Sequence, residues 1–197
     1  MADDYNILQE NEKRYPRFQN FGEMLFWSYA NLQMLVPAKN MGKLIYDRGC
    51  YMIRAKAFKA YKEGRWQIND LYKNNIWKMQ SYDFCWYCGK EVNSKQELTA
   101  DHIFPRSKGG TNDMDNIMFV CKQCNFSKRD TDLLEWYFEK RHVFPPIHIL
   151  AHYLKNIYLY AKDNDLLDKH REEMEQMQLP FNFRYIPLDY PQPEYFI

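Results

Sequence analysis

Hydrophobic residues recur every three or four positions near the start of the chain, as one buried face of a helix requires. The recurrence runs through Phe21, Met24, Leu25, Tyr29, Leu32 and Val36. Pro37 and Gly42 interrupt it, and a second helix is predicted from about Leu44 to Lys62. A third helix is predicted over about 68–79, so residues 1–81 are expected to form a helical region.

The pattern changes near residue 82, where Cys, Gly, Asn and Asp become frequent. Two short strand-like runs follow, Leu98–Phe104 and Asn116–Val120, separated by a turn-rich loop with Pro105 near its start. The second run leads through Cys121-x-x-Cys124 into a predicted helix. Residues 82–130 are therefore expected to form a separate α+β core.

Helical spacing returns between residues 131 and 178. Thr131 or Asp132 is a candidate N-cap, and Pro145-Pro146 precedes a helix from about Ile147. The acidic run 163–175 predicts a last exposed helix. Residues 179–197 are rich in proline and aromatic residues, which predicts an extended tail that either straps across the body or docks on a partner.

The charge of the chain is unevenly distributed. The formal net charge is only +1 over 197 residues, which argues against a protein that simply coats DNA. Residues 34–80, however, hold ten Lys and Arg against three acids, whereas residues 161–197 hold eight acids against four bases. This asymmetry favours equally a face that meets nucleic acid and a helix with a solvated basic side.

Membrane and secretion signals are not apparent. The first residues, Met-Ala-Asp-Asp-Tyr, lack the basic start and apolar core of a signal peptide. No run approaches the ~18 apolar residues that a membrane span needs. We therefore expect a soluble, cytoplasmic protein with no membrane partner.

Four of the five cysteines form two Cys-x-x-Cys pairs, Cys85/Cys88 and Cys121/Cys124. In a reducing compartment such pairs are usually metal ligands rather than disulfides. Four thiolates suit a tetrahedral Zn²⁺ and leave no open coordination position, so this zinc is expected to be structural. The remaining Cys50 is expected to be a small buried apolar residue.

The segment that the zinc would clamp carries the candidate chemistry. It contains Asp101-His102, Gly109-Gly110 and Asn116, and it ends in Cys-x-x-Cys-Asn125-x-x-Lys128. This order of elements resembles the HNH endonuclease family, in the subgroup whose ββα-metal core is held by four cysteines and a zinc ion. The resemblance covers about 82–130, a quarter of the chain, and implies a small ββα-metal core embedded in a mainly helical α+β protein.

Hydrolysis of a phosphodiester needs a base for water and a hard cation beside the phosphate. The pKa of a histidine suits His102 to the first task, and Asp101 and Asn125 offer oxygen ligands to Mg²⁺ or Mn²⁺. Neighbouring residues on a strand point to opposite faces, so Asp101 and His102 share one site only where the strand ends or twists.

The resemblance assigns further roles. It implies that Asp101 and Asn125 bind the catalytic metal, that His102 is the general base, and that Asn116 holds the loop between the strands. Arg106, Lys108 and Lys128 are expected to face nucleic-acid phosphate. Asn at the last motif position, where the family has His or Asn, weakens the expectation of tight transition-metal binding.

These features predict an endonuclease that acts on nucleic acid, most readily DNA, and the resemblance implies 5′-phosphate and 3′-hydroxyl products. One alternative is a non-catalytic zinc module that binds nucleic acid or protein. A second is a nuclease subunit of a larger machine, such as a bacterial defence system, with a protein partner or homodimer formed through the flanking helices or the tail. A third is a site-specific homing or restriction enzyme.

Overall fold

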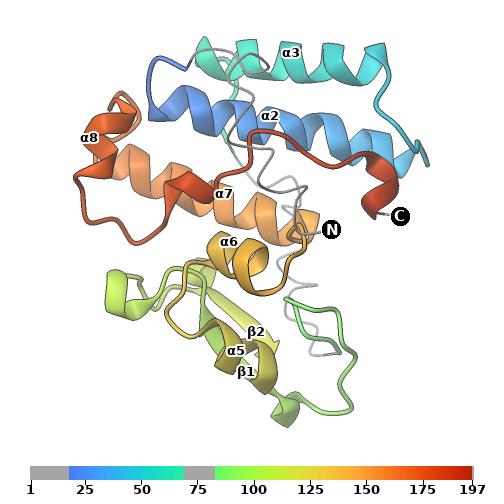
Figure 1. The fold of residues 1–197 in the computed structure, drawn as a ribbon, viewed down its shortest axis with the longest axis vertical. Coiled ribbons are helices and arrows are strands. Elements are labelled where there is room, and N and C mark those ends of the chain that lie inside the picture. Colours follow the sequence, from blue (N-terminus) through green and yellow to red (C-terminus); the bar gives the residue numbers. More distant parts are fainter. Residues whose placement is uncertain (1–17, 69–82, 197) are drawn as a thin grey trace. The chain divides into compact units, whose positions relative to one another are not determined.

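The computed structural model describes residues 18–68 and 83–196, and they form a mainly helical protein with one two-stranded sheet (Figure 1). The described residues group into two compact units. Unit 1 contains 18–68, 157–177 and 186–196, and unit 2 contains 83–156 and 178–185. The third predicted helix lies outside the described residues, apart from Ile68. Within those residues, no helix is long and apolar enough to cross a membrane.

Unit 1 is built on two helices that pack together, α2 (Phe21–Asn40) and α3 (Arg48–Lys62). Each begins at a side-chain cap: Asn20 Oδ1 accepts from the Glu23 amide at 2.9 Å, and Asp47 Oδ1 accepts from the Cys50 amide at 2.9 Å. The cap at Asp47 explains why α3 begins after Leu44. Pro37 lies inside α2, which continues to Asn40 because the proline carbonyl still accepts from the Met41 amide.

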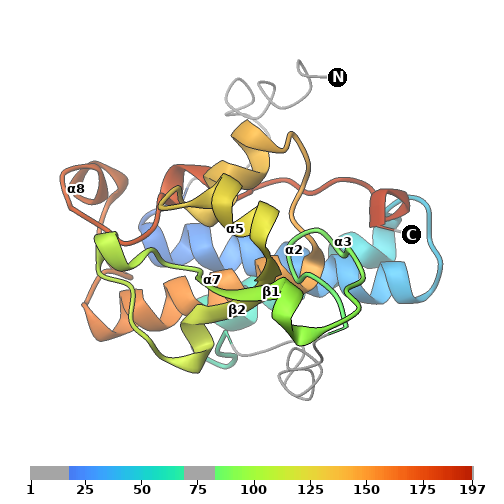
Figure 2. The same ribbon diagram turned by 90° about the horizontal axis from the view of Figure 1, so that it is seen from below.

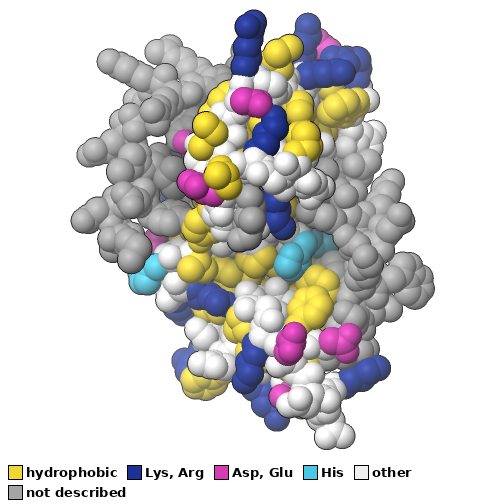
Figure 3. Space-filling model, turned by 90° about the vertical axis from the view of Figure 1, so that its right-hand side faces the viewer, with side chains coloured by type: hydrophobic (Ala, Val, Ile, Leu, Met, Phe, Trp, Pro, Cys, Tyr) yellow, Lys and Arg dark blue, Asp and Glu magenta, His cyan; other side chains and the backbone are white. Residues whose placement is uncertain are grey.

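The outer side of α3 is exposed and combines hydrophobic with basic side chains. Only Cys50, Ala57, Ala60 and Tyr61 of this helix are buried. Large exposed hydrophobic residues are concentrated on α3 and the segment before it: Met41, Leu44, Ile45, Tyr51, Met52 and Ile53. Figure 3 shows one face of the molecule, on which hydrophobic side chains alternate with Lys and Arg. The basic stretch of the sequence is thus, in its described part, an exposed helix face, as both interpretations of the charge asymmetry require.

The last described residues of unit 1 strap across its helices. The Trp27 indole donates to the Leu188 carbonyl at 2.8 Å, and the Tyr46 hydroxyl donates to the Pro191 carbonyl at 2.9 Å. Tyr190 is buried. Two other helices contribute to this unit, α8 (Arg171–Glu175) and the second half of α7 (Ile147–Asp163). Of the two readings of the tail, the structure therefore supports the strap for residues 186–196.

Unit 2 contains the predicted ββα core. Strands β1 (Leu98–His102) and β2 (Ile117–Cys121) pair antiparallel, with Leu98 opposite Cys121 and His102 opposite Ile117. Helix α5 (Lys122–Lys128) follows β2 directly and lies beside the sheet in Figures 1 and 2. The predicted fold class is confirmed. The first strand is shorter than predicted because Ile103 and Phe104 bond to Asn116 instead of continuing the ladder.

A buried carboxylate ties the rest of unit 2 together. Asp132 caps α6 (Leu133–Glu135), which runs into a π-helical turn at Trp136–Lys140. Its Oδ1 accepts from the amides of Leu134 and Glu135, and its Oδ2 accepts from the Tyr153 hydroxyl of α7 and from the Asn182 amide. Burial raises the pKa of this carboxyl, against the lowering effect of these hydrogen bonds.

We expect Asp132→Ala to lower the free energy of unfolding by at least about 3 kcal/mol, because it leaves one buried amide, two partly buried amides and one buried hydroxyl without an acceptor. Urea unfolding followed by tryptophan fluorescence measures the effect, since Trp136 lies in the helical segment that Asp132 caps. Asp130→Ala, two residues earlier and exposed, is the matched control. Equal midpoints for the two variants would contradict this role of Asp132.

Candidate functional site

The four paired cysteines converge on one point. The Sγ atoms of Cys85, Cys88, Cys121 and Cys124 all lie within 4.8 Å of one another, and those of Cys88 and Cys121 are 4.0 Å apart. A tetrahedral zinc with Zn–S bonds of about 2.3 Å places its sulfur atoms about 3.8 Å apart. The donor set and its spacing therefore fit a structural zinc ion.

The cluster joins a turn to the start of the ββα helix. Cys85 and Cys88 lie on a tight turn closed by the hydrogen bond from the Gly89 amide to the Cys85 carbonyl, with Gly89 at φ +71°. Cys121 ends β2, and Cys124 lies in the first turn of α5. The zinc site would thus fix residues 85–88 against the sheet and would set the position of Tyr87.

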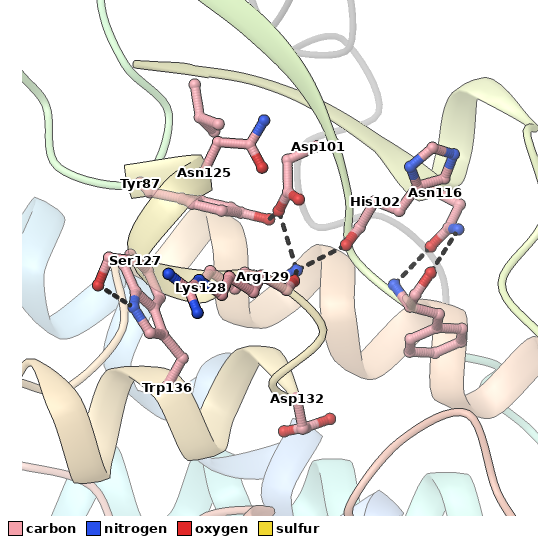
Figure 4. Close-up of polar contacts among 12 residues, drawn as sticks. Tyr87, Asp101, His102, Asn116, Asn125, Ser127, Lys128, Arg129, Asp132 and Trp136 are labelled. Carbon is pink, nitrogen blue, oxygen red and sulfur yellow. Dashed lines mark hydrogen bonds and ion pairs between the residues drawn. The ribbon is translucent and has the colours of Figure 1, made fainter. Parts of the chain in front are cut away.

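An acidic residue and a basic residue pair inside the core, beside this turn. Lys128 Nζ lies 2.9 Å from Asp101 Oδ2, and the Tyr87 hydroxyl donates to the same oxygen at 2.8 Å (Figure 4). The Lys128 side chain is 0% exposed and that of Asp101 is 8% exposed. Lys128 Nζ also donates to the His102 carbonyl at 2.8 Å. One ammonium therefore holds both residues of the Asp-His pair.

Lys128 is therefore buried and does not lie on the surface, where it was predicted to face nucleic-acid phosphate. Lys128 is the last residue of the short helix α5, one turn after Cys124, and both residues are buried on the side that packs on the sheet. Arg106 and Lys108, the other two predicted phosphate contacts, lie on an exposed turn between the strands. The structure brings neither of them into contact with Asp101.

Tyr87 was not among the predicted site residues. Burial, and then the neighbouring Asp101 carboxylate, raise the pKa of its hydroxyl, so it remains protonated and acts as a permanent donor. Its carbonyl accepts from the Tyr137 hydroxyl at 2.9 Å and from Arg141 Nη1 at 3.2 Å. The only sequence signal for this role is its position inside the first Cys-x-x-Cys pair.

Asn125 lies beside Asp101 and offers a second oxygen. Its Nδ2 donates to Thr99 Oγ1 at 2.9 Å, which orients the amide. Figure 4 shows the side chains of Asn125 and Asp101 turned toward each other. Among the described residues, neither Asn125 Oδ1 nor Asp101 Oδ1 takes part in a hydrogen bond. Two adjacent oxygens of this kind fit a hard divalent cation.

His102 points the other way. It is the last residue of β1, and its ring lies on the side opposite Asp101 in Figure 4, as strand alternation requires. Its Nε2 lies 3.0 Å from Oδ1 of Asn112, which comes from the loop between the strands. Asn112 was not predicted as a site residue. The structure thus brings Asp101 and Asn125 together, and it places His102 at the adjoining strand end.

Asn116 closes the loop that carries Asn112. Its side chain accepts from the Phe104 amide at 2.7 Å and donates to the carbonyls of Phe104 at 3.0 Å and Thr111 at 2.8 Å. A Cβ on Gly110 would lie 1.8 Å from the Phe104 carbonyl oxygen, so only glycine fits there. These contacts are those of a residue that holds the loop.

Comparisons with known proteins agree with this geometry. Residues 85–135 match a family model described as HNH endonuclease. The chain is also 34% identical over 91 residues to the CRISPR-associated endonuclease Cas9 of Corynebacterium diphtheriae. That match covers 42% of this chain and only 8% of the relative's length. No solved structure matches significantly. Residues 85–135 therefore match the HNH endonuclease family, and they contain a Cys₄ cluster that fits zinc.

We expect Lys128→Met to cost about 3–5 kcal/mol of stability, because it leaves the buried Asp101 carboxylate without a counter-ion. The double variant Lys128→Met/Asp101→Asn removes that charge as well and should recover most of the loss. Chemical denaturation of both variants measures the difference, with exposed Lys140→Met as the control. A double variant no more stable than Lys128→Met would contradict the importance of the ion pair.

Removing the metal should unfold unit 2 selectively, because a structural zinc site supplies folding free energy directly. We expect one zinc per chain by elemental analysis, and its loss in Cys124→Ser. Hydrogen exchange should then rise across residues 85–128 and stay low across α2. Cys50→Ser, which changes the buried cysteine outside the cluster, should keep the zinc. Unchanged protection in a zinc-free chain would argue against a structural ion.

Proposed function

We propose that this protein is an endonuclease that hydrolyses phosphodiester bonds in DNA, with His102 as general base and with Asp101 and Asn125 as ligands of Mg²⁺ or Mn²⁺. The observation that carries the proposal is the pair of unengaged oxygens on Asp101 and Asn125 on one face of β1, with the ring of His102 on the other face at the strand end. The match of residues 85–135 to HNH endonucleases supports the same reading.

The metal would be held by Asp101 Oδ1 and Asn125 Oδ1, and the chain's own contacts fix both groups. Tyr87 and Lys128 bind the other carboxylate oxygen of Asp101, and Thr99 binds the amide nitrogen of Asn125. When bound, a hard divalent cation offsets the charge that develops on the phosphate and on the leaving oxygen. The Lys128 ammonium adds positive charge within the same buried cluster.

His102 supplies the base, and Asn112 sets its tautomer. Nε2 lies 3.0 Å from Oδ1 of Asn112, which can only accept, so we assign the proton to Nε2 and the free lone pair to Nδ1. Nδ1 takes a proton from water, and the water oxygen attacks the phosphorus. The bond from phosphorus to the 3′ oxygen breaks, that oxygen takes a proton from solvent water, and His102 returns its proton to solvent, giving a 5′-phosphate and a 3′-hydroxyl. The hydrogen bond from Asn116 to the Thr111 carbonyl keeps the next residue, Asn112, beside the imidazole of His102.

The substrate phosphate would lie across the end of β1, where the two faces of the strand meet. His102 reaches this point from one face, and Asp101 with Asn125 from the other. The exposed Arg106 and Lys108 belong to the turn that follows the strand and would bind neighbouring phosphates, which adds affinity without sequence preference.

We further propose that this nuclease serves a bacterial defence or restriction system together with a protein partner. The chain is similar to only a short part of a CRISPR-associated endonuclease. This similarity supports a nuclease module whose activity is directed by other polypeptide segments. The exposed hydrophobic and basic side of α3 is a surface on which such a partner could bind.

The alternative is a non-catalytic zinc module that binds nucleic acid. One observation favours it: the Asp101 charge is already neutralised by Lys128, which weakens the attraction of this carboxylate for a metal ion. The two functions differ in what His102 contributes. A binding module keeps its affinity and its role when the imidazole is removed, whereas the nuclease loses turnover.

We expect the purified chain to cut supercoiled plasmid in Mg²⁺ or Mn²⁺ but not in EDTA. His102→Ala should lower the rate at least about 100-fold, the usual contribution of a general base. Asn112→Ala should cause a smaller loss. His142→Asn is the control, because it replaces an exposed histidine at φ +53° with a residue that adopts this conformation readily. Equal rates for His102→Ala and wild type would rule out the assigned base.

A further inference from the structure

An open pocket lies on the solvent side of α5, next to the proposed metal ligands. Its volume is about 430 Å³, and it is lined by one residue of β1, three residues of α5 and the C-cap of that helix: Thr99, Lys122, Asn125, Phe126 and Arg129. Asn125 thus borders both this pocket and the Asp101 carboxylate. A ligand in the pocket would lie beside the reacting phosphodiester.

One wall of the pocket is an aromatic ring that the fold does not bury. Phe126 is 72% exposed, the highest exposure of any large hydrophobic residue in the described chain. Such a ring contributes little to the hydrophobic core. Its flat face is of the kind on which nucleic-acid bases stack, in a manner that tolerates every base.

The Arg129 side chain is folded back against this ring. Its guanidinium carbon lies 4.5 Å from the centroid of Phe126, and its Nε donates to the Phe126 carbonyl at 3.2 Å. Arg129 itself has φ +53° and ψ −130°, a backbone conformation that non-glycine residues rarely adopt. The end of α5 therefore holds a cation and an aromatic ring as one preorganised unit.

The charge of the pocket is positive. Lys122 and Arg129 line it, and none of the lining residues is acidic. In the described part of the chain, neither cation takes part in a salt bridge. An anionic ligand would therefore not have to displace a carboxylate from either cation. A nucleotide has a phosphate, which the two cations can bind, and a flat base, which can stack on the ring of Phe126.

We propose that this pocket binds an unpaired nucleotide next to the cleaved bond, with its base on Phe126 and its phosphate between Lys122 and Arg129. A base reaches an aromatic side chain only after it has left the stack of a duplex. The substrate class is therefore single-stranded or locally unpaired nucleic acid. This inference rests on the proposed nuclease function, because it uses the position of Asn125 beside the metal site.

The test compares binding of a labelled 20-nucleotide oligonucleotide and of the matching duplex to the full-length chain. Fluorescence anisotropy is measured in the His102→Ala background, so that no strand is cut. Phe126→Leu keeps an apolar side chain but removes the ring, and Phe126→Trp restores a stacking surface. We expect Phe126→Leu to weaken single-strand binding roughly 5- to 150-fold, the equivalent of ~1–3 kcal/mol for one stacked base. Phe126→Trp should bind like Phe126, and duplex binding should stay unchanged.

The cations give an independent readout. Lys122→Ala should weaken binding and reduce the salt dependence of affinity, because one phosphate contact is lost. Lys162→Ala, an exposed lysine in the last turn of α7, is the matched control and should change neither. An unchanged salt dependence in Lys122→Ala would overturn the phosphate position.

The proposal is overturned if Phe126→Leu binds the single strand as tightly as wild type, or if it loses single-strand and duplex binding equally. Cleavage separates this outcome from failure of the nuclease function. On a duplex with one bulged nucleotide, wild type should cut beside the bulge and Phe126→Leu should not favour it. Cutting with no dependence on Phe126 would leave the nuclease and remove the pocket. Phe126-dependent binding by a chain that never cuts would support the nucleotide pocket and contradict the nuclease function.

Discussion

A single buried ammonium group organises the core of unit 2. Lys128 Nζ binds the carboxylate of Asp101 and the backbone carbonyl of the next residue, His102. These two contacts fix helix α5 to strand β1 at the point where the chemistry is proposed. A buried charge is tolerated only with such partners. Tyr87 adds a neutral donor to the same carboxylate, and the cysteine cluster holds Tyr87 in place. Two donors therefore hold the Asp101 carboxylate through its Oδ2 atom.

The same pairing sets a condition on metal binding. A divalent cation at Asp101 and Asn125 would share the carboxylate with an ammonium that lies 2.9 Å from its other oxygen. Two cations around one carboxylate repel each other, so the affinity for Mg²⁺ is expected to be modest and to rise when substrate phosphate joins the site. Asn125 brings no charge to offset this repulsion. The arrangement suits an ion that binds together with its substrate.

The helical regions and the two strands followed from residue spacing, because strand alternation and helical periodicity are local signals, whereas the ββα-metal core was implied by the resemblance to HNH endonucleases. The positions of Asp101, Asn125 and Asn116 were predictable for the same reason: each lies in a short motif. The burial of Lys128 and the roles of Tyr87 and Asn112 were not, since they depend on which face of α5 packs on the sheet and on where the interstrand loop folds back. The end of α3 was predictable, but its start depended on the Asp47 cap.

The amide of Asn116 makes the interstrand loop a closed ring, with its two ends fastened at Phe104 and Thr111. The segment between Phe104 and Thr111 is thus anchored at both ends, and a change within it would have little effect on the strand end that carries His102. The exposed turn at Arg106–Lys108 can thus change in length or composition with little disturbance of the imidazole. This turn is therefore a place where a recognition segment can be inserted while His102 and the other proposed catalytic residues keep their positions.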